Sequence, residues 1–249
     1  MVGGTLLRLA GQGHDVTYLI CTDGSKGTRD VSEISRMQAV RQREQQDAGR
    51  VIGVRSVHFL NYIDGELPEG LALRRDIVRV IRTERPDVVL AWDPTSVWIG
   101  DTVINHIDHR TAGKEAIDAV YPGAGNVAMF PELGLEISRT REVWLYGSNH
   151  PNVFVDIESE FEKKVKALQC HVSQHYTDRD YLYRFLRDDN RWICRDFDNP
   201  VTRRQVARPE YVESFRRIAL DPILGLASAL SPVWEPFSQT DHVTKEGES

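Results

Sequence analysis

The sequence is poor in cysteine and has no excess of basic residues. Its 249 residues include three cysteines, the widely spaced Cys21, Cys170 and Cys194, and this odd number does not make a disulfide framework. Such usage is typical of a reducing compartment and predicts a cytoplasmic protein. The 31 Lys and Arg residues are outnumbered by 37 Asp and Glu residues, which gives a formal net charge of −6. This balance argues against a dedicated nucleic-acid-binding protein and excludes no enzyme that acts on small molecules.

Long uninterrupted hydrophobic runs are also absent. The most apolar stretch, residues 218–234, is broken by Asp221, Pro222 and Pro232, so we do not expect it to span a bilayer as a helix. The chain does not open with the basic region and apolar core of a secretory signal. Hydrophobic residues make up 41% of the sequence, which is enough for one large folded domain or two small ones.

Signatures of several common enzyme classes are missing. No Gly-x-Ser-x-Gly occurs, which excludes the usual nucleophile of the α/β-hydrolases. No Gly-x-Gly-x-x-Gly follows an apolar strand-like run, so dinucleotide binding has no support. The segment T-D-G-S-K-G-T (residues 22–28) lacks the spacing of a P-loop. Its glycines and hydroxyls are compatible either with backbone N–H groups that bind an anion or with a turn-rich connection.

What is present is an alternation of apolar strand-like segments and amphipathic helix-like segments. Strands are predicted at residues 16–21, 56–60, 87–92, 142–146 and 152–155. Helices are predicted at residues 4–9, 32–52, 71–84, 106–120 and 157–171. This alternation predicts an α/β fold with a mostly parallel sheet between two helical layers. Ligands of such sheets bind beyond the carboxyl ends of the strands, so we expect the chemistry in the loops at residues 22–30, 61–70 and 93–109.

Two parts of the chain depart from this alternation. The sequence opens with a helix-like segment where a parallel α/β unit normally has a strand, so we expect a first strand to be missing from it. After about residue 174 the composition shifts towards Arg, Asp and aromatic residues. We expect residues 1–175 to form the core and residues 176–249 to form a helical or irregular C-terminal extension packed on it.

The strongest candidate for chemistry is His106-Ile107-Asp108-His109, which opens a predicted helix after a polar loop. Histidines three residues apart lie on one helical face, so both rings are able to point at one ligand. A neutral imidazole is a good zinc ligand, and Asp108 is placed to orient a ring by accepting its N–H. Histidine is also the commonest acid or base near neutral pH. The alternative is a polar helix start with solvated side chains, because two histidines are not a complete metal site.

Two further candidates are open to two interpretations each. Arg41 and Glu44 are three residues apart on the long predicted helix, which favours an exposed ion pair, although an arginine aimed into a cleft holds a substrate oxygen. Asp64 is followed by Gly65 after the second predicted strand. Such a pair is common in simple turns, so position alone does not distinguish a turn from a ligand-binding loop.

Taken together, these segments resemble the PIG-L/LmbE-like zinc-dependent N-deacetylases. The matching segments are, in chain order, G-G-T-L-L-R-L-A-G-Q-G-H-D-V (3–16), C-T-D-G-S-K-G-T (21–28), R-Q-R-E (41–44), F-L-N-Y-I-D-G-E-L (59–67), R-P-D-V-V-L (85–90), H-I-D-H-R (106–110) and A-L-Q-C-H-V-S-Q (167–174). The His-x-Asp-His motif is fairly specific, and the other segments occur in the order of the family. The resemblance implies a Rossmann-like α/β fold and hydrolysis of acetamido groups on amino sugars such as N-acetylglucosamine and their conjugates.

The resemblance also implies roles for five residues. His109 resembles the histidine zinc ligand of the family, and His106 resembles the histidine that acts as general acid and stabilises the oxyanion. Asp108 resembles the residue that orients this histidine, while Arg41 and Asp64 resemble substrate-contacting positions. The implied cofactor is Zn²⁺, and the implied partner is a small N-acylated amino sugar or conjugate, with no nucleic acid and no membrane span. A homo-oligomer is compatible with the sequence.

One motif of the family is absent from this sequence. Family members carry an Ala-His-Pro-Asp-Asp-type segment that supplies two of the three zinc ligands and the aspartate base, whereas Met1 and Val2 alone precede Gly3 here. A late start assignment and a true truncation are the two explanations. We expect weak zinc binding and little deacetylase activity from the chain as given. The alternative is a catalytically inactive relative that serves as a module for binding a sugar or another small molecule.

Overall fold

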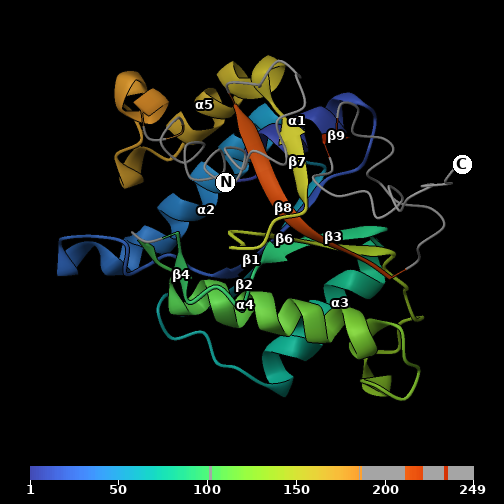
Figure 1. The fold of residues 1–249 in the computed structure, drawn as a ribbon. Helices are drawn as coiled ribbons and strands as arrows, with labels where there is room; N and C mark the ends of the chain where they lie inside the picture. Colours follow the sequence, from blue (N-terminus) through green and yellow to red (C-terminus); the bar gives the residue numbers. More distant parts are fainter. Residues whose placement is uncertain (101–102, 185, 187–210, 221–232, 235–249) are drawn as a thin grey trace, which may run out of the picture.

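The computed structural model describes residues 1–100, 103–184, 186, 211–220 and 233–234, and the statements below concern these residues. Its α-helices are α1 (Gly3–Gly11), α2 (Ile34–Ile52), α3 (Leu71–Glu84), α4 (Ile107–Asp118) and α5 (Phe161–Gln169). Its strands are β1 (Thr17–Thr22), β2 (Ser56–Tyr62), β3 (Val88–Trp92), β4 (Trp98–Ile99), β5 (Val103–Ile104), β6 (Glu142–Tyr146), β7 (Val153–Asp156), β8 (Val212–Ala219) and β9 (Val233–Trp234). Figure 1 shows α1, α2 and α5 on one side of the strands and α3 and α4 on the other.

The helices follow the periodicity of the sequence. In α3, Leu73, Ile77 and Ile81 lie one turn apart on one face, and none is more than 4% exposed. Helices α2 and α3 end at the left-handed residues Gly53 (φ 91°) and Arg85 (φ 53°), as is common at helix C-termini. None of the helices in the described part of the chain combines the length and the apolar character needed to cross a membrane.

The described strands form a mixed arrangement. Strand β1 pairs in parallel with β2, and a five-stranded sheet has the order β3-β6-β8-β7-β9. In this sheet β3 and β6 are parallel, whereas the pairs β6–β8, β7–β8 and β7–β9 are antiparallel. The prediction of an α/β fold is confirmed, but the prediction of a mostly parallel sheet is not, because the larger sheet is mixed.

The mixed sheet has one structural cause, the direction of β8. Strands β6 and β7, which residues 147–152 connect, run in the same direction as each other and opposite to β8. Strand β8 inserts between β6 and β7 and pairs with both in antiparallel register. It comes from residues 176–249, which the sequence predicts to pack on the core, and it contributes an inner strand of the sheet. The Rossmann-like arrangement implied by the family stays a prediction.

Strand β8 also holds the first helix. The Glu213 carboxylate accepts the backbone N–H groups of Gly4 (2.9 Å) and Thr5 (2.7 Å) at the start of α1. The same carboxylate pairs with Lys164 Nζ of α5 at 2.8 Å, and both side chains are buried. Because a helix N-terminus carries a partial positive charge, a carboxylate at this position stabilises α1.

The core consists of two apolar clusters, one on each side of the strands. The first includes Trp144 and Phe215 and packs against α1, α2 and α5, while the second lies beneath α3 and α4. Gly113 brings α4 onto β3, because a Cβ at this residue would lie 2.2 Å from the Trp92 carbonyl oxygen. This close approach places the start of α4 beside the carboxyl end of β3.

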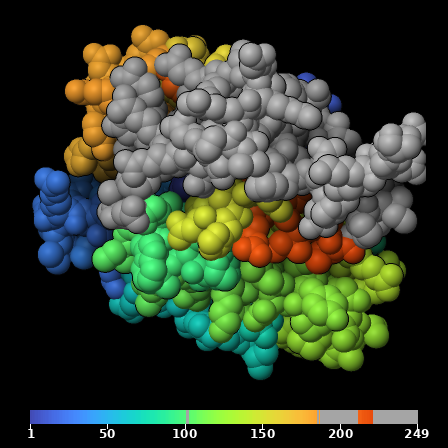
Figure 2. All heavy atoms as spheres, in the orientation of Figure 1, coloured from blue at the N-terminus to red at the C-terminus, as the bar shows by residue number. Residues whose placement is uncertain are grey.

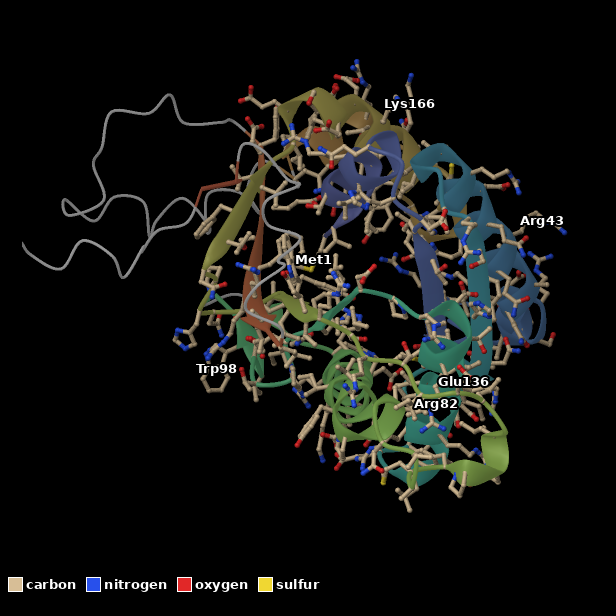
Figure 3. All side chains as sticks on the ribbon, turned by 90° about the vertical axis from the view of Figure 1, so that its right-hand side faces the viewer. Met1, Arg43, Arg82, Trp98, Glu136 and Lys166 are labelled. Atoms are coloured by element: carbon tan, nitrogen blue, oxygen red, sulfur yellow. The ribbon has the colours of Figure 1, made fainter. Side chains whose placement is uncertain are left out.

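The polar loop predicted at residues 93–109 contains the short hairpin β4–β5. Its Trp98 side chain is 62% exposed and lies at the edge of the molecule in Figure 3. Asn149 fastens the hairpin, accepting from the Gly100 N–H (3.1 Å) and donating to the Trp98 carbonyl oxygen (2.8 Å). In Figure 2 the green surface of the hairpin adjoins the yellow surface of the segment near residue 150. Among the described cysteines Cys21 and Cys170 are free thiols, and Cys194 lies outside the described residues.

Candidate active site

The loops that follow β1 and β2 are joined by hydrogen bonds. The Asp23 N–H donates to the Tyr62 carbonyl oxygen at 2.8 Å, which extends the β1–β2 pairing by one bond. The Asp23 Oδ1 atom accepts the N–H groups of Ser25 (2.9 Å) and Asp64 (3.1 Å). Asp64 is therefore fixed at the carboxyl ends of the strands, where the sequence predicts a ligand-binding loop.

Asp108 connects the second loop to α4. Its carboxylate accepts the N–H groups of Gly65 (2.6 Å) and Leu67 (3.2 Å), and Asp108 itself is buried. The nearest approach between this carboxylate and the His106 ring is 3.9 Å, from Oδ2 to Nδ1. Asp108 thus shapes the loop that carries Asp64, and its carboxylate makes no hydrogen bond to His106 in this structure.

His106 is the N-cap of α4. Its Nδ1 atom accepts the backbone N–H of Asp108 at 3.2 Å, and the side chain is 49% exposed. Because Nδ1 is the acceptor, the proton of the neutral ring lies on Nε2. His106 therefore presents an N–H donor to solvent at the carboxyl ends of the strands.

His109 lies one turn further along α4 and has the opposite tautomer. Its ring stacks on Trp92, with centroids 3.9 Å apart, and its Nδ1 atom is 3.1 Å from Asn105 Oδ1. The Asn105 Nδ2 group donates to the Ser96 carbonyl oxygen at 2.9 Å, which leaves the amide oxygen as the atom that faces the imidazole. The His109 proton therefore lies on Nδ1, and Nε2 keeps a free lone pair.

The protonation state of His109 follows from its surroundings. Burial, reinforced by the nearby His106, lowers the pKa of His109 to about 4, while Asp108 opposes the shift. The two imidazole centroids are 5.4 Å apart. His109 is therefore neutral at pH 7, and the neutral imidazole is the form that binds a metal ion.

Three donor groups around His106 form a possible site for a divalent metal ion, and His109, the predicted zinc ligand, is not one of the three. Asp64, His106 and Asp108 offer ligand atoms that lie within 4.8 Å of one another. Carboxylate oxygens and imidazole nitrogens are typical zinc ligands. Both Asp108 oxygens and His106 Nδ1 already accept backbone N–H groups, whereas the geometry leaves His109 Nε2 without a proton.

Arg41 reaches the first loop from α2. Its Nη2 atom donates to the Gly27 carbonyl oxygen at 2.7 Å, and a Cβ at Gly27 would lie 2.5 Å from this nitrogen. Its Nε atom is buried and has no hydrogen-bond partner among the described residues. Glu44 points elsewhere, since its carboxylate accepts the Ser173 N–H and O–H, each at 2.6 Å. Arg41 therefore stabilises the loop through Nη2, and its Nε–H remains available as a hydrogen-bond donor to a ligand. Arg43, by contrast, points outward from α2 (Figure 3).

Two polar residues at the site carry no clear sequence signal. Asn105, which is 2% exposed, sets the His109 tautomer, although the sequence predicts only that it belongs to a polar loop. Asp93 is 1% exposed; its Oδ1 atom accepts the Thr95 N–H (2.9 Å) and O–H (2.6 Å). Its Oδ2 atom is buried without a partner among the described residues. The single available signal for both residues is that they flank the loop after β3.

Comparisons with known proteins agree with this geometry. Residues 1–120 match the model of the PIG-L family, described as GlcNAc-PI de-N-acetylase. The diacetylchitobiose deacetylase of Thermococcus kodakarensis is 39% identical over 176 residues, which cover 70% of this chain and 64% of that protein. This chain therefore spans less than two thirds of the length of that relative.

Solved structures give the same result. The N,N'-diacetylchitobiose deacetylase of Pyrococcus horikoshii, in complex with an inhibitor, is 31% identical with a TM-score of 0.74, and the match covers 87% of this chain and 78% of that one. GalB, the 4-carboxy-2-hydroxymuconate hydratase of Pseudomonas putida KT2440, is 21% identical with a TM-score of 0.67 over 87% of this chain and 89% of that one, and shares the fold alone. The fold therefore occurs with more than one reaction, and function has to be argued from the site. On the family model, the sequence identity and the shared structure, this chain belongs to the PIG-L family.

Proposed function

We propose that this chain forms the site of a zinc-dependent hydrolase that removes the acetyl group from an N-acetylated amino sugar or a related conjugate. The observation that carries the proposal is the pair of neighbouring histidines with opposite tautomers. His109 offers a lone pair to a metal ion, and His106 offers an N–H to a substrate oxygen. The two diacetylchitobiose deacetylases that the chain resembles support this reaction and this class of substrate.

The chain's own residues have distinct tasks in this reaction. His109 would hold zinc through Nε2, and bound zinc would supply Lewis-acid activation of an amide carbonyl and of water. The His106 Nε2–H donates to the carbonyl oxygen as negative charge develops on it, a contribution of about 3 kcal/mol. His106 then gives this proton to the leaving nitrogen and takes up a proton from the attacking water, so that the C–N bond breaks and acetate and an ammonium group are formed. Arg41, on α2 beside the first loop, and Asp64, on the second loop, contact the sugar.

The described donors limit how well the chain carries out this reaction. A catalytic zinc site uses three protein ligands and a water molecule. Near His109, both Asp108 oxygens and His106 Nδ1 already accept backbone N–H groups, so few free ligand atoms remain among the described residues. We therefore propose that these 249 residues bind zinc weakly and release acetate slowly. We place the protein in the cytoplasm, because Cys21 and Cys170 are free thiols.

The proposal is tested by acetate release from N,N'-diacetylchitobiose with added ZnCl₂. We expect slow, zinc-dependent release, a fall in kcat of about 10²-fold or more for His106→Ala with zinc binding retained, and loss of zinc for His109→Ala. His14→Ala, which changes an exposed histidine before β1, is the matched control and keeps the parent rate. Equal rates for the parent and His106→Ala would remove His106 from the mechanism.

The incomplete donor set favours one alternative, a non-catalytic sugar-binding module. In that case Arg41 of α2 and Asp64 of the second loop hold the sugar, and no bond is broken. The same experiment separates the two functions. Saturable binding of diacetylchitobiose without acetate release, at zinc concentrations that fill the site, supports the module and contradicts the hydrolase.

A further inference from the structure

Exposed apolar side chains gather on the hairpin β4–β5 and at its two ends. The side chains concerned are each at least 46% exposed and are Val97, Trp98, Val103, Ile104 and Ile107. Single exposed apolar residues are ordinary, but a group of them beside polar residues marks a surface that binds a ligand or a partner. This group ends at the residue next to His106, so it adjoins the candidate active site.

The hairpin holds Trp98 close to His106. Trp98 of β4 pairs with Ile104 of β5, and the Val97 carbonyl oxygen accepts the Asn105 N–H at 2.9 Å. His106 is the next residue along the chain. From the spacing of an antiparallel pair and the rise of two extended residues, the Cα atoms of Trp98 and His106 lie within about 13 Å of each other. A ligand of two linked sugar rings is long enough to reach from one residue to the other.

A hollow lies beside the Trp98 side chain. Its volume is about 440 Å³, and it is lined by Thr95, Val97, Trp98, Gly100, Asn149 and His150. This size lies within the range of small-molecule sites. His106 and Asp64 do not line the hollow, so it is separate from the atoms that would act on an acetamido group.

The walls of the hollow differ in chemistry. Trp98 offers an aromatic surface, and the face of such a ring carries partial negative charge. Asn149 accepts the Gly100 N–H at 3.1 Å and donates to the Trp98 carbonyl oxygen at 2.8 Å. These two bonds fix the amide and leave it a second lone pair and a second N–H, while His150 adds a polar imidazole. A pyranose ring matches these walls, because its C–H faces stack on an aromatic ring and its hydroxyl groups bind polar side chains.

Other occupants fit the hollow less well. A protein partner usually contacts about 20–30 residues on each side, whereas two short segments, residues 95–100 and 149–150, line this hollow. Its lining contains no Lys or Arg, so a phosphorylated ligand would find no counter-charge there. An uncharged sugar needs neither a large interface nor a counter-ion.

We propose that Trp98, Asn149 and His150 form a subsite for a second pyranose ring, so that the preferred substrates are N-acetylated amino sugars joined to another sugar. Trp98 stacks on the second ring, and Asn149 and His150 bind its hydroxyl groups. The assignment of this ring to the substrate rests on the proposed function, which places the acetamido group at His106. Binding of the ring itself needs no bond cleavage, so the subsite is testable without turnover.

The first test is calorimetric titration in EDTA with N,N'-diacetylchitobiose and with N-acetylglucosamine. We expect Trp98→Ala to weaken binding of the disaccharide about tenfold and to leave binding of the monosaccharide within about twofold of the parent. Tyr121→Ala removes an aromatic ring that is 75% exposed and outside the hollow, and should bind both sugars as the parent does. Equal disaccharide binding by the parent and Trp98→Ala, or an equal loss for both sugars, would overturn the proposal.

Two further variants examine the walls one at a time. Trp98→Phe keeps a smaller aromatic face and should lose less affinity for the disaccharide than Trp98→Ala. His150→Ala removes one hydrogen-bonding group and should weaken disaccharide binding about threefold or more, whereas His14→Ala, at an exposed position before β1, should not. If Trp98→Ala does not fold, full disaccharide affinity in both Trp98→Phe and His150→Ala would still overturn the proposal.

Acetate release with added ZnCl₂ separates the subsite from the proposed function. We expect Trp98→Ala to raise the KM for diacetylchitobiose about tenfold, with kcat within about twofold of the parent. Disaccharide binding that depends on Trp98, without acetate release, supports the subsite and contradicts the hydrolase. Acetate release with the same KM in the parent and Trp98→Ala supports the hydrolase and contradicts the subsite. If Trp98→Ala changes sedimentation from dimer to monomer and leaves sugar binding unchanged, the hollow is a contact between two copies and the proposal is wrong.

Discussion

The His109 imidazole lies flat on the Trp92 indole, with centroids 3.9 Å apart and ring planes inclined by 7°. The stack joins the last residue of β3 to the first turn of α4 and depends on Gly113, which lets the two backbones approach. The stack fixes the plane of the imidazole, and Asn105 fixes which nitrogen carries the proton. Backbone packing and one buried amide thus prepare a single nitrogen for a ligand.

The tautomers of the two histidines are directly measurable. Long-range ¹H–¹⁵N spectra of metal-free protein at pH 7 are expected to show His109 protonated on Nδ1 and His106 protonated on Nε2. In Asn105→Ala the acceptor for His109 Nδ1 is lost, so we expect a mixture of tautomers for His109 with His106 unchanged. Asn126→Ala removes an exposed asparagine from another loop and should leave both rings as in the parent. A pure Nε2–H form of His109 in the parent would contradict this assignment.

Acid is expected to destabilise the protein through His109. Its pKa of about 4 in the folded state lies below the ordinary value of 6.5, because burial disfavours the charged ring. The unfolded chain therefore takes up a proton that the folded chain does not, so this contribution to stability is present above pH 6.5 and is lost as the pH falls towards 4. Since the ring is partly exposed, we expect the contribution to be about 1–2 kcal/mol.

The measurement is urea unfolding in EDTA at pH 7.5 and pH 4.5. His109→Phe keeps a ring on Trp92 but has no proton to bind, so its free energy of unfolding should fall less between the two pH values than that of the parent. His14→Phe, at an exposed position, serves as the control and should follow the parent. The same pH dependence in the parent and His109→Phe would show that His109 does not carry the effect.

The contact between α4 and β3 predicts a sharp effect of one methyl group. Gly113→Ala places a Cβ against the Trp92 carbonyl oxygen, and we expect the free energy of unfolding to fall by about 1–3 kcal/mol. Gly11→Ala adds the same atom at the end of α1, where no atom lies within 4 Å, and should cost nothing measurable. Urea unfolding of the two variants compares them. Equal free energies of unfolding for Gly113→Ala and Gly11→Ala would contradict this prediction and would mean that α4 moves away from β3 without loss of stability.

Much of the fold is predictable because the buried residues recur at the spacing of each element. Helix α3 and strand β6 lie at their predicted bounds, residues 71–84 and 142–146. The hairpin β4–β5 is not predictable in this way, because two residues per strand are too few to show a period. The place of β8 between β6 and β7 is a choice among distant partners, which local pattern does not encode.

The residues of the candidate site also fall into those that local spacing predicts and those that depend on distant contacts. His106, Asp108 and His109 are conspicuous in the sequence because their spacing places them on one helical turn. Asn105 and Trp92 are not, because their roles depend on contacts with Ser96 and with the His109 ring that form when the loop after β3 folds back. Asp108 has the predicted position but binds two backbone N–H groups of the neighbouring loop. A role for its carboxylate in orienting His106 stays a prediction.

The carboxylate that holds the start of α1 predicts a large loss of stability. Glu213→Gln removes the negative charge that Lys164 and the α1 N–H groups share, and leaves the buried ammonium group without its counter-ion. Breaking such a buried pair costs about 3–5 kcal/mol of the free energy of unfolding, measured in urea. Asp47→Asn breaks the exposed Asp47–Arg50 pair and should cost no more than about 0.5 kcal/mol.

The double variant Glu213→Gln, Lys164→Met separates the charge from the packing. If the cost of Glu213→Gln comes from the unpaired Lys164 ammonium, removing that group should recover about half of the loss or more, because replacing a whole buried pair is close to neutral. If the cost comes from the start of α1, the double variant should stay as unstable as Glu213→Gln, because Gly4 and Thr5 still lack their carboxylate. A Glu213→Gln variant as stable as Asp47→Asn would contradict both explanations, and β8 would then hold α1 by apolar packing alone.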